Sequence, residues 1–490
     1  MDTLGRNDSL ERGTKRKYAG DWPEMRGPAK AATASRGDDY YRALYAEALD
    51  FRLLGQRDPE FKAVLGRGSY LDFADPRSVM QLTKTLLKLD FGLLVDLPTD
   101  RLCPPVPNRH NYILWLKDLL DSSSPLRADS RGTARGVTGL DIGTGASLIY
   151  PLLGCAQRPS WSFVATDVDA KSLAYARKNA ALNNLQSRIR VVGRATTDRL
   201  IPLDELGLAA VDFVMVNPPF YTSAAELDDL ARQKSRPPNS ACTGAPVEMV
   251  CAGGEIGFVR RMILESLVLS ERVQWYTAML GKQSSLEVLV SVLRDHGVAN
   301  YAVTAFVQGS KTRRWALGWS FGNSRPSLSA CRGCEPAAGK KLLPPPTEAA
   351  VATWTASRVD VAQLERSICD AMESLDLASW TWDKSLYRGV GFVDSNVWGR
   401  AYRRKKARER ERGGACFQSE ETVGDGSSYP QQEEAERRVC QDTSQCSFGF
   451  SVSVRNDADE VAVMARWLQG NDYAIFESFT GFLRKSIGLN

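Results

Sequence analysis

The sequence contains only two histidines, His110 and His296, among its 490 residues. Catalytic triads and metal centres that depend on several histidines would need nearly the whole supply, which makes them poor first hypotheses. No run of about eighteen apolar residues occurs, and the first twenty residues are polar and charged. This pattern argues against a transmembrane segment and a secretory leader, so we expect an intracellular protein with no membrane partner.

The ten cysteines are expected to be reduced thiols in such a protein. Cys331 and Cys334 have the spacing of half a zinc site. A second correctly spaced pair is missing, because Cys440 and Cys446 lie too far apart. We therefore expect no bound metal.

Charge is distributed unevenly although the formal net charge is only +5. Residues 400–412 contain eight basic and two acidic residues, a local excess larger than that of the whole chain. Near the amino terminus, Lys15–Lys17 is a second basic cluster. It is either a nuclear-import signal or an ordinary solvated charge run.

Composition divides the chain into five parts. We expect a disordered basic arm (1–36), a large domain with a helical lead-in (37–321), a Pro- and Gly-rich linker (322–350), a small α+β unit (351–412 plus 445–490), and a disordered insertion within that unit (413–444). In the tail, residues 448–454 alternate like a half-buried strand, whereas Val461, Met464, Trp467 and Leu468 have helical spacing. The tail is too short to fold alone, so it should pack on residues 351–410.

The large domain alternates short β-rich runs with helical patterns. We expect strands at 137–141, 163–166, 189–192, 211–216 and 273–279, helices at 170–182, 255–270 and 284–294, and a terminal hairpin at 301–307 and 314–321. This order predicts an α/β domain with a doubly wound, Rossmann-like parallel sheet covered on both faces.

A glycine-rich turn follows the first strand. Asp141, Gly143 and Gly145 stand in a pattern that lets the backbone approach a ligand closely. A dinucleotide fingerprint would need a further glycine where Leu148 stands, so S-adenosylmethionine fits better. Asp167 ends the second strand, where a carboxylate can accept both ribose hydroxyls. The alternative is that Asp167 caps the following helix.

The segment Asn217, Pro218, Pro219 and Phe220 directly follows the fourth strand. An adenine amine is a poor nucleophile because its lone pair is delocalised into the ring. The Asn217 amide oxygen and the Pro218 carbonyl can each accept one N–H of that amine, and the prolines stiffen the backbone. Phe220 offers an aromatic face to an unstacked base. A simple Pro-rich turn is the alternative.

Such a site could also methylate an amide nitrogen on a protein. Basic and aromatic residues near the predicted site favour nucleic acid, and looped or single-stranded RNA above all: Arg232, Lys234, Arg236, Lys282, Arg313, Arg314 and Trp315. Each of these residues taken singly could be an ordinary surface residue.

The sequence resembles the methyltransferase-like sixteen family, the U6 small nuclear RNA adenine-N6 methyltransferases. The matching stretches are 90–93, 106–107 with Arg109 and 111–113, 141–147 with 149–154, 217–220, 253–255, 279–282 and 314–317. The tetrapeptide alone is less specific, since bacterial ribosomal-RNA adenine methyltransferases share it. The basic run and the tail also resemble the carboxy-terminal RNA-binding module of the family.

The resemblance implies a class I methyltransferase that uses S-adenosylmethionine, releases S-adenosylhomocysteine and acts on structured RNA such as U6. It places Arg109, Gly143, Ser147, Asp167 and Asp198 at the methyl donor. Lys282 and 313–315 would lie along the RNA, with Arg403, Arg404, Lys405 and Lys406 in the carboxy-terminal module. A nuclear location follows, with the cytoplasm as an alternative. The other functions left open are a ribosomal-RNA methyltransferase and a non-catalytic RNA-binding scaffold.

Three positions depart from the family pattern. The family often has Glu where Asp167 stands, a change that preserves the ribose contact. It often has Thr where Asp198 stands, so only a backbone contact is expected there. A family Lys is replaced by Ala74, which removes one expected RNA contact. Oligomeric state and the exact target adenosine do not follow from the sequence.

Overall fold

The computed structural model describes residues 36–123, 136–223, 226, 244–308, 312–334, 342–414 and 446–488. The chain divides into two units, residues 1–43 and 44–490. The first contains helix α1 (Asp38–Ala43). The predictions for Lys15–Lys17 and for Arg232, Lys234 and Arg236 fall outside the described residues, as do those for the disordered segments apart from their edges.

The second unit begins with a helical lead-in, whose elements are α2 (Phe51–Arg57), α3 (Pro59–Ala63), η1 (Arg67–Ser69), α4 (Pro76–Leu86), η2 (Leu87–Phe91) and α5 (Val106–Ser122). Between η2 and α5 an extended strap crosses helix α7 (Ala170–Leu182). Asn183 donates to the Leu94 carbonyl at 2.7 Å and accepts its N–H at 2.8 Å. Asn179 likewise donates to the Asp96 carbonyl at 3.0 Å and accepts the Asp96 N–H at 2.7 Å. Two side-chain amides therefore replace the backbone partners that a neighbouring strand would supply.

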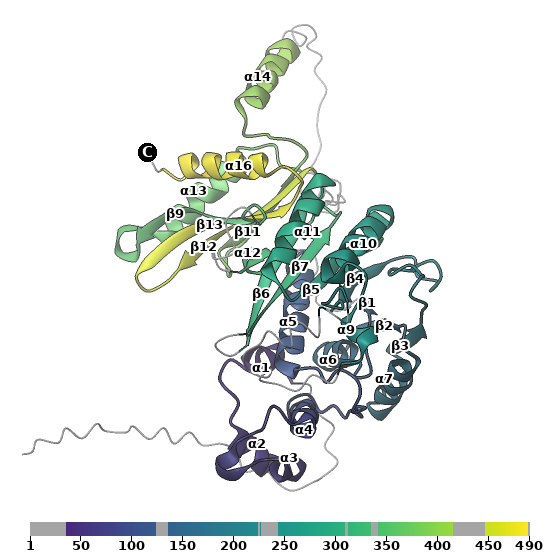
Figure 1. Cartoon of the computed structure of the whole chain (residues 1–490). Coiled ribbons are helices and arrows are strands. Elements are labelled where there is room, and N and C mark those ends of the chain that lie inside the picture. The colour runs from purple at the N-terminus through teal and green to yellow at the C-terminus, as the bar shows by residue number, and fades with distance from the viewer. Residues whose placement is uncertain are drawn as a thin grey trace, which may run out of the picture. The chain divides into compact units, whose positions relative to one another are not determined.

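An eight-stranded sheet forms the centre of the large domain, in the order β3-β2-β1-β4-β5-β7-β6-β8 (Figure 1). Its strands are β1 (Val137–Ile142), β2 (Trp161–Asp167), β3 (Ile189–Gly193), β4 (Val211–Val216), β5 (Val273–Leu280), β6 (Asn300–Gln308), β7 (Thr312–Ser320) and β8 (Arg332–Gly333). The first five are parallel, and β7 runs antiparallel to both β5 and β6. The predicted parallel sheet and hairpin are confirmed. The chain order reverses between β1 and β4, where open α/β sheets bind their ligands.

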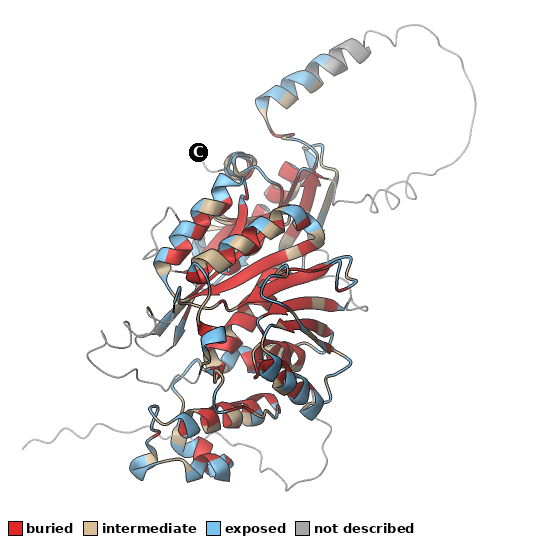
Figure 2. Ribbon diagram, turned by 45° about the vertical axis from the view of Figure 1, so that its right-hand side comes forward, coloured by how far each residue is buried: buried red, intermediate tan, exposed pale blue. Residues whose placement is uncertain are grey.

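Helices cover both faces of this sheet, and they are α5, α6 (Ile149–Gln157), α7, α10 (Gly254–Leu269) and α11 (Gln283–Asp295). The short helices α9 (Pro246–Met249) and η4 (Ser270–Arg272) lie in the connections on either side of α10. Successive residues of a strand point to opposite faces. Val214 packs in the cluster formed with α10 and α11, whereas its neighbour Phe213 makes tilted and edge-on contacts with the rings of Trp161 and Phe163, under α6. Figure 2 shows the strands largely in the colour of buried residues.

A second sheet has the order β10-β11-β12-β13-β9. The carboxy-terminal module built on this sheet contains β9 (Glu348–Thr355), η6 (Ala356–Arg358), α13 (Val361–Glu373), β10 (Ser379–Asp383), β11 (Arg388–Val393), α14 (Arg400–Gly414), β12 (Phe448–Asn456), β13 (Glu460–Gln469) and α16 (Tyr473–Ser486). The tail strands β12 and β13 pair with β11 and β9, as expected for a tail that completes this module.

The helix predicted at Val461–Leu468 is wrong, because these residues form strand β13. Val461, Val463, Ala465 and Trp467 alternate into the core of the module. Ala462 and Leu468 are also buried, although they point to the other face of the strand. Apolar residues on both faces imitate the spacing of a helix.

The linker predicted at 322–350 is also wrong, since most of its described part is packed. It contains helix α12 (Leu328–Cys331) and strand β8, which pairs with β6. Arg325 is buried and its main-chain N–H donates to the Leu468 carbonyl at 2.8 Å. Cys331 and Cys334 are buried free thiols.

Candidate active site

A cavity of about 540 Å³ lies at the carboxyl ends of β1, β2 and β4. Of the residues predicted to bind the donor or the target base, those that line it are Arg109, Gly143, Gly145, Ser147, Asp167, Asp198, Asn217 and Pro219. Asp141, Pro218 and Phe220 are adjacent in sequence but do not line it. The structure thus brings the glycine turn and the Asn-Pro-Pro segment, more than 70 residues apart in sequence, to one site.

The glycine turn has the backbone geometry that its residues predict. Gly143 and Gly145 have φ of +70° and +65°, a region that side chains with a Cβ rarely adopt. The N–H groups of Gly143 and Thr144 both donate to the Thr166 carbonyl at 2.9 Å. These bonds fix the turn beside the end of β2.

Asp167 is held by two main-chain donors at the edge of the cavity. Its Oδ2 accepts the Gly145 N–H at 2.8 Å and its Oδ1 accepts the Asp169 N–H at 2.9 Å. Burial raises the pKa of Asp167, and these N–H bonds oppose the rise. Helix α7 is capped by Asp169 instead, so the alternative that Asp167 is the cap is wrong. Each carboxylate oxygen keeps a further lone pair for a hydroxyl.

Asp141 is completely buried beneath the turn. Neither of its carboxylate oxygens has a hydrogen-bond partner, and the Thr144 hydroxyl also lacks one. Burial raises the pKa of Asp141 to about 7, which the nearby Thr144 hydroxyl lowers only in part; Asp167 adds to the rise and Arg109 opposes it. Asp141 therefore lies beneath the turn as a structural residue, and its carboxyl group holds a proton more readily than that of an ordinary aspartate.

Arg109 reaches the cavity from α5. Its Nη1 lies 3.1 Å from the Met279 Sδ and its Cζ 5.6 Å from the centre of the Tyr150 ring. Asp198 has a different setting. Its carboxylate accepts the Ala195 N–H at 2.9 Å and pairs with Arg194 at 3.3 Å, so it is already engaged within its own loop.

Asn217 leaves β4 with its amide oxygen buried and without a hydrogen-bond partner. Phe220 is partly exposed, and the Arg314 Cζ lies 5.9 Å from its ring centre. A Cβ on Gly281 would lie 3.1 Å from the Phe220 ring, so a larger residue there would press on the ring. The target motif therefore presents an unsatisfied acceptor and, close by, an accessible aromatic ring.

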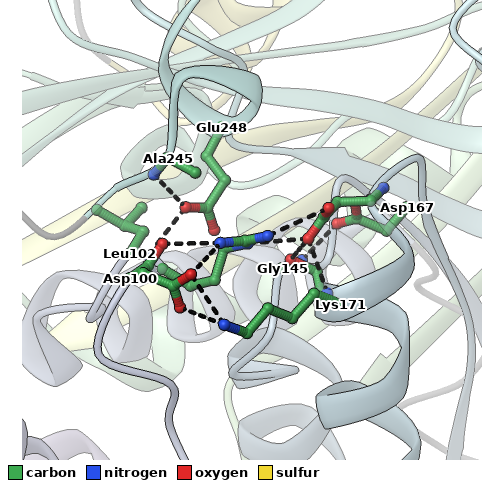
Figure 3. A network of polar contacts seen from close by, with 10 residues as sticks. Asp100, Leu102, Gly145, Asp167, Lys171, Ala245 and Glu248 are labelled. Carbon is green, nitrogen blue, oxygen red and sulfur yellow. Dashed lines mark hydrogen bonds and ion pairs between the residues drawn. The ribbon is translucent and has the colours of Figure 1, made fainter.

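Two glutamates that sequence reasoning did not single out as site residues support this arrangement. Glu255 is buried and accepts the N–H groups of Gly281 and Lys282 at 2.6 and 3.2 Å. Glu248 lines the cavity and accepts the N–H groups of Leu102 and Ala245 at 2.9 and 2.8 Å (Figure 3). Glu255 lies in a stretch that carries the family resemblance, whereas no local motif marks Glu248.

The predicted RNA contacts differ in accessibility. Trp315 is only 5% exposed, so the prediction that it lies along the RNA is wrong: β7 turns its ring into the core. Arg313 is exposed, Arg314 is partly buried, and Lys282 forms an ion pair with Glu226 at 3.6 Å. On α14, Arg403, Arg404 and Lys405 are exposed and Lys406 pairs with Asp376.

Comparisons with known proteins show the family of this chain. A family model described as RNA methyltransferase matches residues 35–323, more than half of the chain. The chain belongs to this RNA methyltransferase family. A relative from Schizosaccharomyces pombe, named U6 small nuclear RNA (adenine-(43)-N(6))-methyltransferase, is 34% identical over 417 residues, which cover 85% of this chain and 95% of the relative.

Human METTL16, named RNA N(6)-adenosine-methyltransferase, is 44% identical over 280 residues. The match covers 56% of this chain and 48% of METTL16, so the chain spans about half the length of that relative. A crystal structure of the human METTL16 catalytic domain in complex with the MAT2A 3'UTR hairpin 1 is 42% identical, with a TM-score of 0.50. It covers 56% of this chain and 92% of the crystallised chain. The catalytic domain of human METTL16 thus resembles the large domain of this chain.

Two further features concern metals and membranes. Among the described residues, no group of three or more His, Cys, Asp or Glu side chains is arranged to hold a metal ion. No helix in the part of the chain that the structure describes is long and apolar enough to cross a membrane.

Proposed function

We propose that this protein transfers a methyl group from S-adenosylmethionine to the N6 of an adenosine in structured RNA. The observation that carries the proposal is the Asn217 amide oxygen, which is buried, unpartnered and placed in the same cavity as the glycine turn and Asp167. A buried acceptor without a partner is costly for the free protein, and a substrate N–H would satisfy it.

The residues at the glycine turn fit an adenosine-type donor. Gly143 and Gly145 leave room for a ligand beside the backbone, and Asp167 keeps lone pairs for ribose hydroxyls. Arg109 and Ser147 add a cation and a hydroxyl to the wall. When bound, S-adenosylmethionine supplies an electrophilic methyl group on a sulfonium; this chain binds and orients it.

Asn217 and Pro218 supply two oxygen acceptors for the adenine amine. Holding both N–H groups draws the nitrogen toward a tetrahedral geometry and directs its lone pair at the donor. Phe220 offers its ring to the base, and the Arg314 guanidinium lies near that ring. This mechanism needs no histidine base at the reacting nitrogen.

The RNA substrate class is supported by charge around the site and on α14. Arg313 and the α14 residues Arg403, Arg404 and Lys405 are exposed cations, and such side chains bind phosphates. U6 small nuclear RNA is the substrate we propose to test first, because the relative with 95% of its length matched carries that name. A ribosomal RNA substrate and a non-catalytic scaffold are the competing functions.

The experiment is incubation of the purified chain with labelled S-adenosylmethionine and a U6 transcript, followed by mapping of N6-methyladenosine. Replacement of one preorganised polar group in a transition state typically costs about a hundredfold or more, so N217A should lose at least that factor in methylation rate. Asn396 is a matched control, since its amide oxygen is also buried and unpartnered but lies outside the cavity. If N217A methylates as fast as N396A, the assigned chemistry is wrong.

We also propose that the protein works in the nucleus. The support is the family's U6 substrate together with the basic cluster Lys15–Lys17 in the sequence. Imaging of the full chain and of a variant with all three residues changed to alanine should show nuclear accumulation that the variant loses. A cytoplasmic signal in both would refute the proposal.

A further inference from the structure

Glu248 is a carboxylate in the cavity wall that the proposed chemistry does not use. It lies on the short helix α9, it is partly buried, and one carboxylate oxygen, Oε2, accepts two main-chain N–H bonds. Burial raises its pKa, and the N–H groups of Ala245 and Leu102 oppose that rise. The two bonds differ in kind. The bond to Ala245 is local, of the sort found at helix starts, whereas the bond to Leu102 joins residues 146 positions apart.

On the donor side, the Leu102 bond fixes the end of the strap that crosses α7. Leu102 lines the cavity, and its neighbour Arg101 forms an ion pair with Asp169 at 2.9 Å. Asp169 in turn donates its main-chain N–H to Asp167. The Oε1 of Glu248 lies 3.8 Å from the position that a Cβ of Gly145 would occupy. Glu248 thus contacts the strap and lies beside the glycine turn.

On the target side, the segment that carries Glu248 is hydrogen bonded to the residue after Phe220. The Tyr221 N–H donates to the Met249 carbonyl and the Cys251 N–H donates to the Tyr221 carbonyl, both at 3.0 Å. Any movement of α9 is therefore transmitted to Tyr221 through two main-chain bonds. Glu248 therefore links Leu102 to the segment 245–251, and that segment is bonded to Tyr221 beside the target motif.

We infer that Glu248 is a positioning residue that couples the donor wall of the cavity to the target motif 217–220. The inference rests on the proposed function. With the two N–H bonds in place, the strap and the segment 245–251 hold each other, so a bound donor and the base acceptors keep one geometry. Without them, the donor wall and the target motif move independently, and both donor binding and the transfer step suffer.

Three substitutions separate reach, charge and bulk. E248A removes both acceptor bonds. E248Q keeps an oxygen that accepts both N–H groups but has no charge. E248D keeps the charge but shortens the side chain by one methylene, so it cannot reach both donors. D383A is the matched control, because Asp383 also accepts two main-chain N–H bonds, from Ser385 and Leu386, but lies in the second sheet, away from the cavity.

The measurements are the dissociation constant for S-adenosylhomocysteine by calorimetry, and KM for the donor and kcat on the U6 transcript. We expect E248A to weaken S-adenosylhomocysteine binding and to lower kcat at saturating donor, each by at least about tenfold, since the two main-chain N–H groups both lose their acceptor. E248Q should stay within about threefold of the wild type, and E248D should fall between. D383A should match the wild type in all three values.

Each outcome decides between the possible roles. If E248A raises only the donor KM and leaves kcat unchanged, Glu248 is a wall residue without coupling, and the inference is wrong. If E248Q is as impaired as E248A, the charge of Glu248 matters and its two hydrogen bonds to Leu102 and Ala245 do not. That result would also overturn the inference. Should E248A fail to fold, E248D and E248Q give the same test. A wild-type protein that binds S-adenosylhomocysteine but methylates no adenosine would refute the proposed function instead.

Discussion

The guanidinium carbon of Arg325 lies 4.3 Å from the centre of the Trp467 indole ring. Arg325 lies between β7 and β8 of the first sheet, and Trp467 belongs to the second. The Nε of Arg325 also donates to the Gly470 carbonyl at 2.7 Å. Burial lowers the pKa of Arg325 to about 10, which leaves it charged at neutral pH. A buried, stacked and hydrogen-bonded cation therefore joins the large domain to the carboxy-terminal module.

We expect R325A to loosen this joint without changing the donor site. Removal of a buried cation that stacks on an indole and donates to a carbonyl costs about 2–4 kcal/mol. The thermal unfolding midpoint should fall by several degrees. On the proposal that the large domain and the carboxy-terminal module both bind RNA, U6 affinity should also fall, because the two parts no longer share one orientation. R325K should recover only part of the lost stability and U6 affinity, since lysine cannot form the planar stack.

Calorimetric titration with S-adenosylhomocysteine provides the internal control for this variant. Arg325 does not line the cavity, so the dissociation constant should be unchanged. A loss of donor binding in R325A would mean that the substitution unfolds the large domain. Unchanged RNA affinity together with lower stability would mean that the joint does not orient the RNA-binding surfaces.

Asp141 should give the free protein an unusual pH dependence of stability. Burial raises the pKa of Asp141 to about 7, whereas an unfolded aspartate titrates near its ordinary value of 3.8. Between these values the folded state holds a proton that the unfolded state has released, so this residue makes the protein less stable as the pH rises. The effect is on the order of 1.4 kcal/mol per pH unit and levels off above pH 7.

Urea unfolding of the wild type and D141N at pH 5, 6, 7 and 8 measures this contribution. The stability of D141N relative to the wild type should increase from pH 5 to pH 7 and then stay constant, because an amide does not titrate. A difference that is independent of pH would show that Asp141 keeps an ordinary pKa in the folded protein.

Much of this architecture follows from local sequence patterns, and the exceptions have physical causes. Parallel strands bring their carboxyl ends to one edge, so the placement of Gly143 and Asn217 in one cavity could be predicted from strand order. Strand β13 could not, because both of its faces carry apolar residues. Glu248 was also missed, since its partner Leu102 is 146 residues away and only the folded chain brings them together.

The linker shows the same limit. Proline and glycine between 322 and 350 indicate an open connection by composition. Arg325 in this segment packs on Trp467, and the position of Trp467 depends on the pairing of β13 with β9 and β12. No pattern around Arg325 reveals that partner, so tertiary pairing overrides the composition of the segment.

Helix α14 should contribute salt-dependent RNA affinity. Arg400, Arg403, Arg404 and Arg408 are exposed on it. Changing these four to glutamine should weaken U6 binding and reduce the slope of log affinity against log salt by up to about 0.7 for each phosphate that the helix no longer neutralises. The control is R366Q, an exposed arginine on α13 whose Nε donates to the Ala362 carbonyl. An unchanged slope in the fourfold variant would place the RNA elsewhere.

Phe220 should act on the base and not on the donor. Its ring is partly exposed, and it does not line the cavity. Stacking of an aromatic side chain on a base is worth about 1–3 kcal/mol, so F220A should lower kcat/KM for U6 by roughly ten- to a hundredfold. The dissociation constant for S-adenosylhomocysteine should be unchanged. F220Y keeps the ring and should retain most activity. If F220A weakens donor binding as much as it slows methylation, the ring supports the cavity wall and does not hold the purine, because a pure stacking role leaves the donor site intact.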